Sequence, residues 1–222
     1  MGKSSNKLSV LVAAGSLWGL SEAGLGMYLR GTCAHSITGS VMTGVAILFL
    51  AMSLAFSRKL HTALIVLGVA VIFKLLDAFL LGLPVLHGAI INPIFGFVTE
   101  ALAFVILFAA VGAHLKEKLH GRAILGGLSA LAAVNLFPFV GHFTGIPACV
   151  VAGTQFPLSL YYAPFAVVLS AATCPLGMSL GERLAVGFFE QAKPRKFAVL
   201  IRVSAPAISV ICLAVMILFR IA

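Results

Sequence analysis

Residues 62–83 read TALIVLGVAVIFKLLDAFLLGL, an apolar run whose charged side chains are Lys74 and Asp77. A helix of about 20 apolar residues is long enough to cross the hydrocarbon core of a bilayer. The rest of the chain is of the same kind, since 61% of its 222 residues are hydrophobic and 9% are charged. Soluble domains do not carry so large an apolar fraction. The sequence therefore predicts an integral membrane protein in contact with the lipid bilayer.

Similar apolar runs recur along the chain with short gaps between them, which predicts an all-α polytopic bundle in one membrane domain, residues 1–222. The first run could pass for a secretory signal, but its apolar character continues to Tyr28 without a cleavage site, so we expect this helix to be retained. Pro164 and Pro175 interrupt the sixth run. Six to seven spans are expected, and the seven ranges are 8–29, 37–56, 62–83, 92–113, 123–143, 159–181 and 198–220.

The basic residues predict the orientation of the bundle, because cytoplasmic loops carry an excess of Lys and Arg. Arg30 and Arg220 fall on one side of the predicted membrane. The other side collects Lys3, Lys7, Arg58, Lys59, Lys116, Lys118, Arg122, Arg183, Lys193, Arg195, Lys196 and Arg202. We therefore expect a cytoplasmic N-terminus and an external C-terminus. The expected location is a prokaryotic inner membrane. The net charge of +9 forms no patch interleaved with aromatic residues, which argues against a nucleic-acid partner.

Ionisable side chains inside membrane spans are costly and commonly mark functional sites. At 1.5 Å per residue, Glu22, Lys74, Asp77 and Glu100 lie about 2 to 7 Å to the outer side of the midplane. Asn135 falls in the same layer. One lysine cannot neutralise three carboxylates, so the sequence predicts an outward-facing site for a cationic or amine-bearing ligand, a metal ion or a proton.

Lys74 and Asp77 are three residues apart and can pair on one helix face. Two interpretations stay open for this pair. It forms one wall of the binding site, with Glu22 and Glu100 opposite, or it is a packed structural ion pair.

The segment HGAIINP, residues 87–93, leads into the fourth predicted span. Asn92, Gly96 and Glu100 follow one another at four-residue steps and share one helix face. Together with His87, at the start of this segment, Asn92 is a candidate contact for the ligand.

His35, His87 and His142 all fall on the predicted outer side and could bind a transition metal such as nickel, cobalt or zinc. Each stands alone in its loop, without helical ligand spacing, and solvated interfacial histidines are the simpler interpretation. Cys33 and Cys149 also fall in outward loops, where a disulfide could form in an oxidising compartment.

Gly15, Gly19 and Ala23 form a stripe of small residues at four-residue steps on the first predicted helix. Such stripes let helix backbones approach closely. The stripe can pack inside the bundle, or it can dock another membrane subunit. The sequence holds no nucleotide-binding, serine-hydrolase or metalloprotease motif and no haem-binding histidine pair, so we expect neither an enzyme nor a cofactor.

The small-residue stripe and the polar layer of Glu22, Lys74, Asp77 and Glu100 resemble those of the substrate-binding S component of an energy-coupling-factor (ECF) transporter. The resemblance is architectural and covers about the first 180 residues. It implies a pocket open to the outside and a coupling subunit with two ATPases, docked on Gly15, Gly19 and Ala23. The family usually has an Ala-x-x-x-Ala step where this chain has mostly Gly, and its vitamin-type members have six helices.

The competing interpretation is a membrane-anchor subunit or enzyme of a redox or respiratory complex. The intramembrane carboxylates would then line a proton path or bind quinone.

Overall fold

The computed structural model describes residues 2–26, 35–148, 150, 153–154, 156–189 and 195–221. Within these residues, seven helices are long and apolar enough to cross a membrane, which confirms the predicted all-α bundle. The long helices are α1 (Gly2–Ser21), α3 (His35–Ser57), α4 (His61–Leu80), α5 (Gly88–Leu115), α6 (Leu119–Leu136), α8 (Ala163–Phe189) and α9 (Arg195–Ile221). The shorter elements are the π-helix η1 (Glu22–Gly26), η2 (Phe137–Phe139), α7 (Val140–Thr144) and η3 (Leu158–Leu160).

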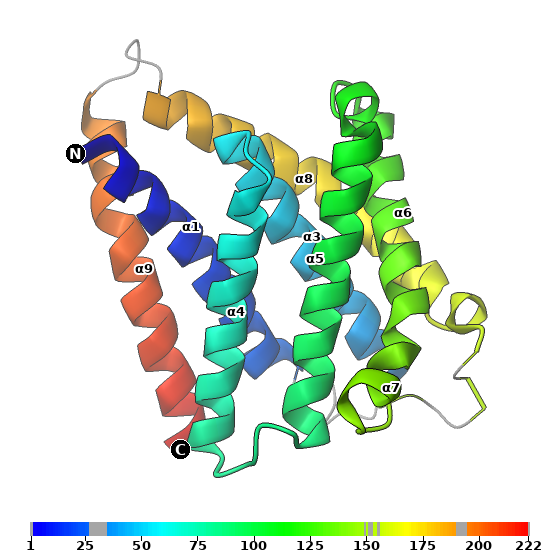
Figure 1. Cartoon of the computed structure of the whole chain (residues 1–222). Coiled ribbons are helices and arrows are strands. Elements are labelled where there is room, and N and C mark those ends of the chain that lie inside the picture. Colours follow the sequence, from blue (N-terminus) through cyan, green and yellow to red (C-terminus); the bar gives the residue numbers. More distant parts are fainter. Residues whose placement is uncertain are drawn as a thin grey trace.

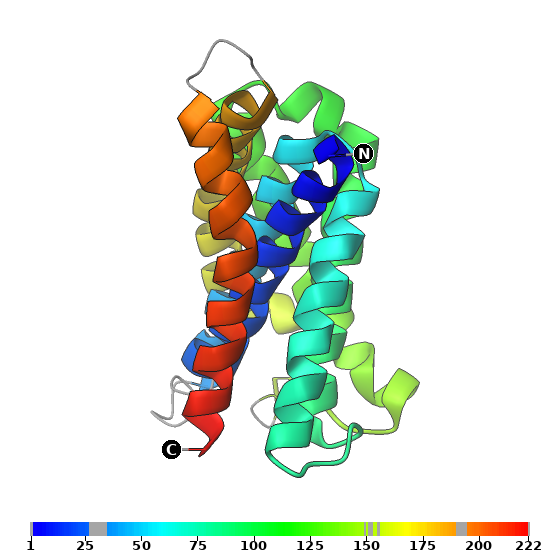
Figure 2. The same cartoon turned by 90° about the vertical axis from the view of Figure 1, so that its left-hand side faces the viewer.

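The helices form two packed groups, which contact each other directly through α3 and are also bridged by α5 (Figure 1). In one group α1 packs against α4 and α9, and Figure 2 shows these three helices side by side. In the other group α8 packs along α3 and against α6. The N- and C-termini lie at opposite ends of the bundle, as an odd number of spans requires (Figures 1 and 2).

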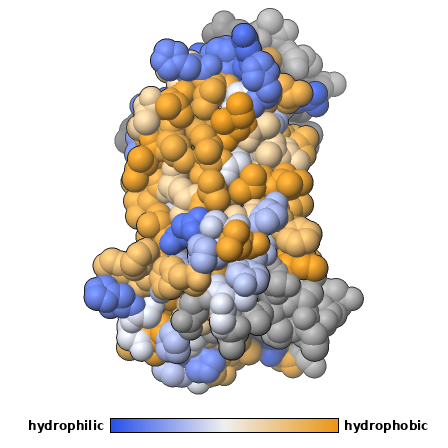
Figure 3. Space-filling view, turned by 90° about the vertical axis from the view of Figure 1, so that its right-hand side faces the viewer, coloured by the Kyte–Doolittle hydropathy of each residue, from blue (hydrophilic) through white to orange (hydrophobic). Residues whose placement is uncertain are grey.

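The surface has the pattern of a membrane protein. Figure 3 shows a face whose upper half is mostly apolar, with hydrophilic residues gathered at its upper end and further polar residues at mid-height and below. Large apolar side chains such as Phe79, Ile106 and Val210 are exposed on the helices. In a bilayer such side chains face lipid rather than water.

The sixth span differs most from its predicted range of 159–181. α8 begins at Ala163 and continues to Phe189. Pro164 is the second residue of this helix, where a backbone N–H would have no partner within the helix. It therefore starts the helix instead of interrupting it. Pro175 lies inside α8, and the helix continues past it. The first helix is described to Gly26, and the rest of its predicted range lies outside the described residues.

The stripe Gly15, Gly19 and Ala23 packs inside the chain, which corrects the prediction that it docks a coupling subunit. A Cβ atom added to Gly15 would lie 2.6 Å from the Cβ of Val69 on α4. One added to Gly19 would overlap Phe73 on the same helix. Ala23 is 3% exposed and belongs to a buried cluster that α9 completes. The pattern predicted a close approach correctly, but the neighbours are the protein's own helices.

The closest contacts of the second group depend on glycines that the sequence analysis did not single out. A Cβ at Gly177 of α8 would overlap the carbonyl oxygen of Leu48 on α3, and one at Gly181 would overlap that of Met52. The two glycines form a Gly-x-x-x-Gly step, a pattern typical of tightly crossing membrane helices. The contact they allow fixes α3, whose first turns line the cavity described below.

Gly177→Ala is expected to lower the free energy of unfolding by about 1–3 kcal/mol, because the added methyl group forces α8 away from the α3 backbone. Thermal unfolding in detergent measures this change. The matched control is Gly68→Ala on α4, where an added Cβ meets nothing within 4 Å. That substitution is expected to be neutral or stabilising. Equal stability of the two variants would contradict the packing described here.

Candidate functional site

The bundle contains a partly open cavity of about 540 Å³ at the end opposite the loops between α3 and α4 and between α5 and α6. α3, α5, α6 and η1 supply its walls, together with residues near the start of α8. Its polar lining residues include Glu22, Thr38, Ser40, Thr43, Asn92, Thr99 and Glu100, and its apolar ones include Met42, Phe97, Val134, Phe137 and Leu158. Ligand pockets in proteins commonly measure 300–1,000 Å³ and have this mixed, mainly apolar lining.

α5 supplies the floor of the cavity. His87 caps this helix, since its Nδ1 accepts a hydrogen bond from the backbone N–H of Ala89 at 3.2 Å. Asn92, Gly96 and Glu100 all line the cavity, which confirms that they share one face. The Nδ2 group of Asn92 donates to the carbonyl oxygen of Pro147 at 3.2 Å. This bond ties α5 to the segment after α7.

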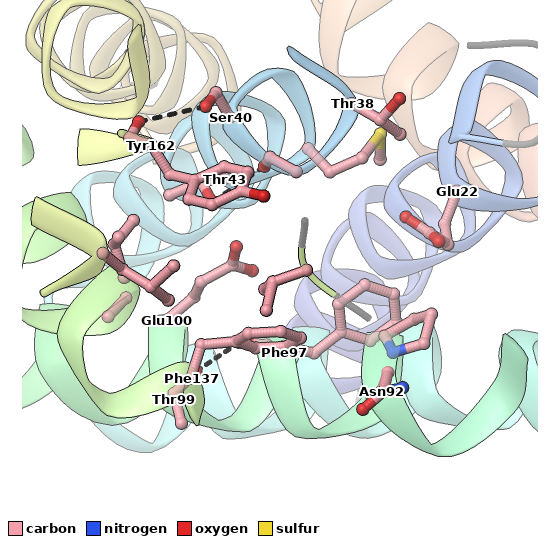
Figure 4. A pocket seen from close by; sticks show the side chains of 18 of the residues that line it. Glu22, Thr38, Ser40, Thr43, Asn92, Phe97, Thr99, Glu100, Phe137 and Tyr162 are labelled. Carbon is pink, nitrogen blue, oxygen red and sulfur yellow. Dashed lines mark hydrogen bonds between the residues drawn. The ribbon is translucent and has the colours of Figure 1, made fainter. Parts of the chain in front are cut away.

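Two carboxyl groups meet in the cavity. Glu22 of η1 is 3% exposed and Glu100 of α5 is 7% exposed. Figure 4 shows them entering from opposite sides, with both carboxyl groups directed into the same space. Thr43 of α3 also lines the cavity, and its hydroxyl group donates to the carbonyl oxygen of Gly39 at 3.0 Å. In the described part of the chain, no Lys or Arg forms an ion pair with Glu100.

Aromatic rings form much of the remaining wall. Phe97, Phe137 and Tyr162 line the cavity (Figure 4). Behind Phe97 lies Trp18 of α1, which is fully buried, with 5.0 Å between the two ring centroids. Ser40 holds the segment before α8 in place by donating to the carbonyl oxygen of Tyr162 at 3.2 Å. The cavity therefore combines carboxylates, hydroxyl groups and aromatic faces.

Lys74 and Asp77 do not line this cavity, which corrects the prediction that they form one wall of the site. Both lie on α4, and Asp77 faces α9 instead. The Nζ of Lys74 is 3.1 Å from Oδ2 of Asp77, and the Nε of Arg220 donates to Oδ1 of the same carboxylate. Lys74 is 4% exposed and Asp77 is fully buried. The packed ion pair is thus the interpretation that the structure supports, with Arg220 as a third member.

Other predicted site residues lie elsewhere. Asn135 is not in the cavity lining, and its Nδ2 donates to the carbonyl oxygen of Leu131 on its own helix. His142 is exposed and its ring contacts Phe143. No group of three His, Cys, Asp or Glu side chains that could hold a metal ion occurs among the residues whose side chains are described. The His35 side chain and the Cys33–Cys149 pair lie outside those residues.

The sequence analysis missed Thr43, the aromatic lining and the role of Arg220. Thr43 lies four residues after Gly39, and this spacing places both on the side of α3 that lines the cavity. Arg220 was counted as an external basic residue at the end of the last span. Its contact with Asp77 joins residues 143 positions apart, and no local sequence pattern indicates such a pair.

Comparison with known proteins gave no match among protein-family models, curated proteins or solved structures. The residues of the cavity indicate which ligands it can hold. Its carboxylates suit a cation, its aromatic faces suit a flat or quaternary group, and its hydroxyl groups can orient a polar substituent.

Proposed function

We propose that this chain is the substrate-binding subunit of a membrane transporter that takes up a small cationic or amine-bearing molecule. The observation that carries the proposal is the Glu100 carboxyl group, which lies in a mainly apolar cavity without an ion-pair partner among the described residues. An ionised carboxylate in such a place is costly unless a countercharge is supplied. The ammonium group of a bound ligand is such a countercharge.

The shape of the cavity supports a ligand with an apolar or aromatic body. Phe97, Phe137 and Tyr162 offer ring faces to it, and a cation held against such rings gains about 0.5–2 kcal/mol. Glu22 approaches from the other side of the cavity. A molecule with an ammonium group near Glu100 and a ring among the aromatic side chains satisfies both features.

The direction of transport follows from the position of the cavity. It lies at the end of the bundle away from the basic loops, which include Arg58 and Lys118. Since basic loops favour the cytoplasm, the cavity faces outward and accepts a molecule for uptake. Single cysteines introduced at these two positions should react with a membrane-impermeant reagent only from the cytoplasmic side.

As in ECF transporters, we propose that a membrane coupling subunit and ATPases supply the energy. The sequence carries no nucleotide-binding motif of its own. Because Gly15 and Gly19 are covered by α4, the partner has to contact another surface of the bundle. Co-purification of an ATPase pair from native membranes tests this part of the proposal, and purification of an active uptake system without any ATPase would overturn it.

A titration with two molecules of the same shape tests the binding function. Trp18 is the single tryptophan of the chain and lies against Phe97, so its fluorescence reports on the cavity wall. Phenethylamine is expected to bind at least about tenfold more tightly than the neutral 2-phenylethanol, because only the amine gives Glu100 a countercharge. Equal affinities, or tighter binding of the anion phenylacetate, would contradict the proposal.

A further inference from the structure

The π-helix η1 continues α1 at the wall of the cavity. π-Helical turns are rare and occur frequently at functional sites. Glu22, the first residue of this turn, lines the cavity, whereas its neighbour Ala23 packs in the buried cluster with α9. The orientation of Glu22 therefore depends on how this turn is held.

Arg220, near the C-terminal end of α9, contacts this turn directly. Its Nη2 donates to the carbonyl oxygen of Ala23 at 3.1 Å, while its Nε donates to Asp77 on α4. A guanidinium group can make both contacts at once because its donors form a rigid fork. One side chain thus joins η1, α4 and α9.

Neutralising Asp77 does not explain the presence of Arg220, because Lys74 already pairs with that carboxylate at 3.1 Å. A second buried cation adds a desolvation cost. Arg220 also bonds to the backbone of η1, which Lys74 does not.

We propose that Arg220 is a positioning residue for the cavity. By binding Asp77 and the Ala23 carbonyl oxygen together, it fixes the η1 turn so that the adjacent Glu22 is directed at the bound molecule. The consequence for ligand affinity rests on the proposed function. The consequence for the order of the η1 turn does not.

Arg220→Lys and Lys74→Met form a matched pair of variants, since each leaves Asp77 with at least one neighbouring cation but only the first loses the forked contact with η1. Hydrogen exchange followed by mass spectrometry measures the backbone exchange rate in residues 20–26, which include η1, and in residues 70–80 of α4. Arg220→Lys is expected to raise exchange in residues 20–26 at least about tenfold and to leave residues 70–80 unchanged. Lys74→Met is expected to leave residues 20–26 unchanged. Arg220→Gln, which keeps N–H donors but no charge, is the second variant if Arg220→Lys does not fold.

Phenethylamine titration of the same variants gives the binding result. Its affinity is expected to fall about tenfold in Arg220→Lys and to stay unchanged in Lys74→Met. Unchanged exchange in residues 20–26 of Arg220→Lys, or an equal rise in Lys74→Met, would overturn the positioning role. If the wild-type protein shows no preference for the amine, the proposed function fails, and the exchange result still decides the role of Arg220.

Discussion

Asp77→Asn is expected to lower the free energy of unfolding by about 3 to 5 kcal/mol, because it leaves the buried cations Lys74 and Arg220 without their shared carboxylate. The loss is large because neither cation can reach water from its position between α4 and α9. Lys74 is 4% exposed, and the Arg220 side chain is 3% exposed. Reversible unfolding in mixed micelles measures the change.

Two further variants separate this effect from a general sensitivity to mutation. Replacing the whole cluster with apolar residues, as Lys74→Met, Asp77→Leu and Arg220→Met together, should recover most of the stability, since no buried charge then remains. Glu117→Gln removes a carboxylate that is 73% exposed and 3.9 Å from Lys116, and it should change stability by less than about 0.5 kcal/mol. An Asp77→Asn protein as stable as the wild type would refute the structural role of the cluster.

Glu100→Gln is expected to weaken ligand binding without lowering stability, in contrast to Asp77→Asn. It should weaken phenethylamine binding by at least about 30-fold, the equivalent of about 2 kcal/mol, because it removes the charge that pairs with the ammonium group. Stability should stay the same or rise, since a neutral amide of similar shape replaces a carboxylate that is 7% exposed. Trp18 fluorescence measures the binding, and the unfolding assay measures the stability.

Comparing Glu100→Gln with Asp77→Asn distinguishes a binding role in the cavity from a structural role in the ion-pair cluster. Glu117→Gln serves again as the control and should bind phenethylamine like the wild type. If Glu100→Gln binds the amine normally, or unfolds as readily as Asp77→Asn, then Glu100 is a structural residue and the amine does not bind in this cavity.

The apolar runs were sufficient to predict the seven spans, because a helix is the simplest way to satisfy backbone hydrogen bonds in lipid. The rise per residue also placed Glu22, Asp77 and Glu100 at a similar depth. Depth does not give the direction in which a side chain points around the helix axis. That direction depends on helix packing, and packing turned Asp77 towards α9 and Glu100 towards the cavity.

Local spacing was informative where one helix supplies the whole pattern. Asn92, Gly96 and Glu100 share a face of α5 as predicted. The Gly15 and Gly19 stripe correctly indicated a close helix contact, but a stripe of small residues does not identify the helix that covers it. Arg220 was hidden for a similar reason, since its partners lie on α4 and η1, far away in the sequence.

A crystal structure of the phenethylamine complex decides whether Glu100 binds the ammonium group. We expect the ammonium nitrogen within about 4 Å of a Glu100 carboxylate oxygen, the limit for an ion pair, with the ring among Phe97, Phe137 and Tyr162. A complex in which the amine lies outside this cavity, or in which its nitrogen points away from both Glu100 and Glu22, would contradict this expectation.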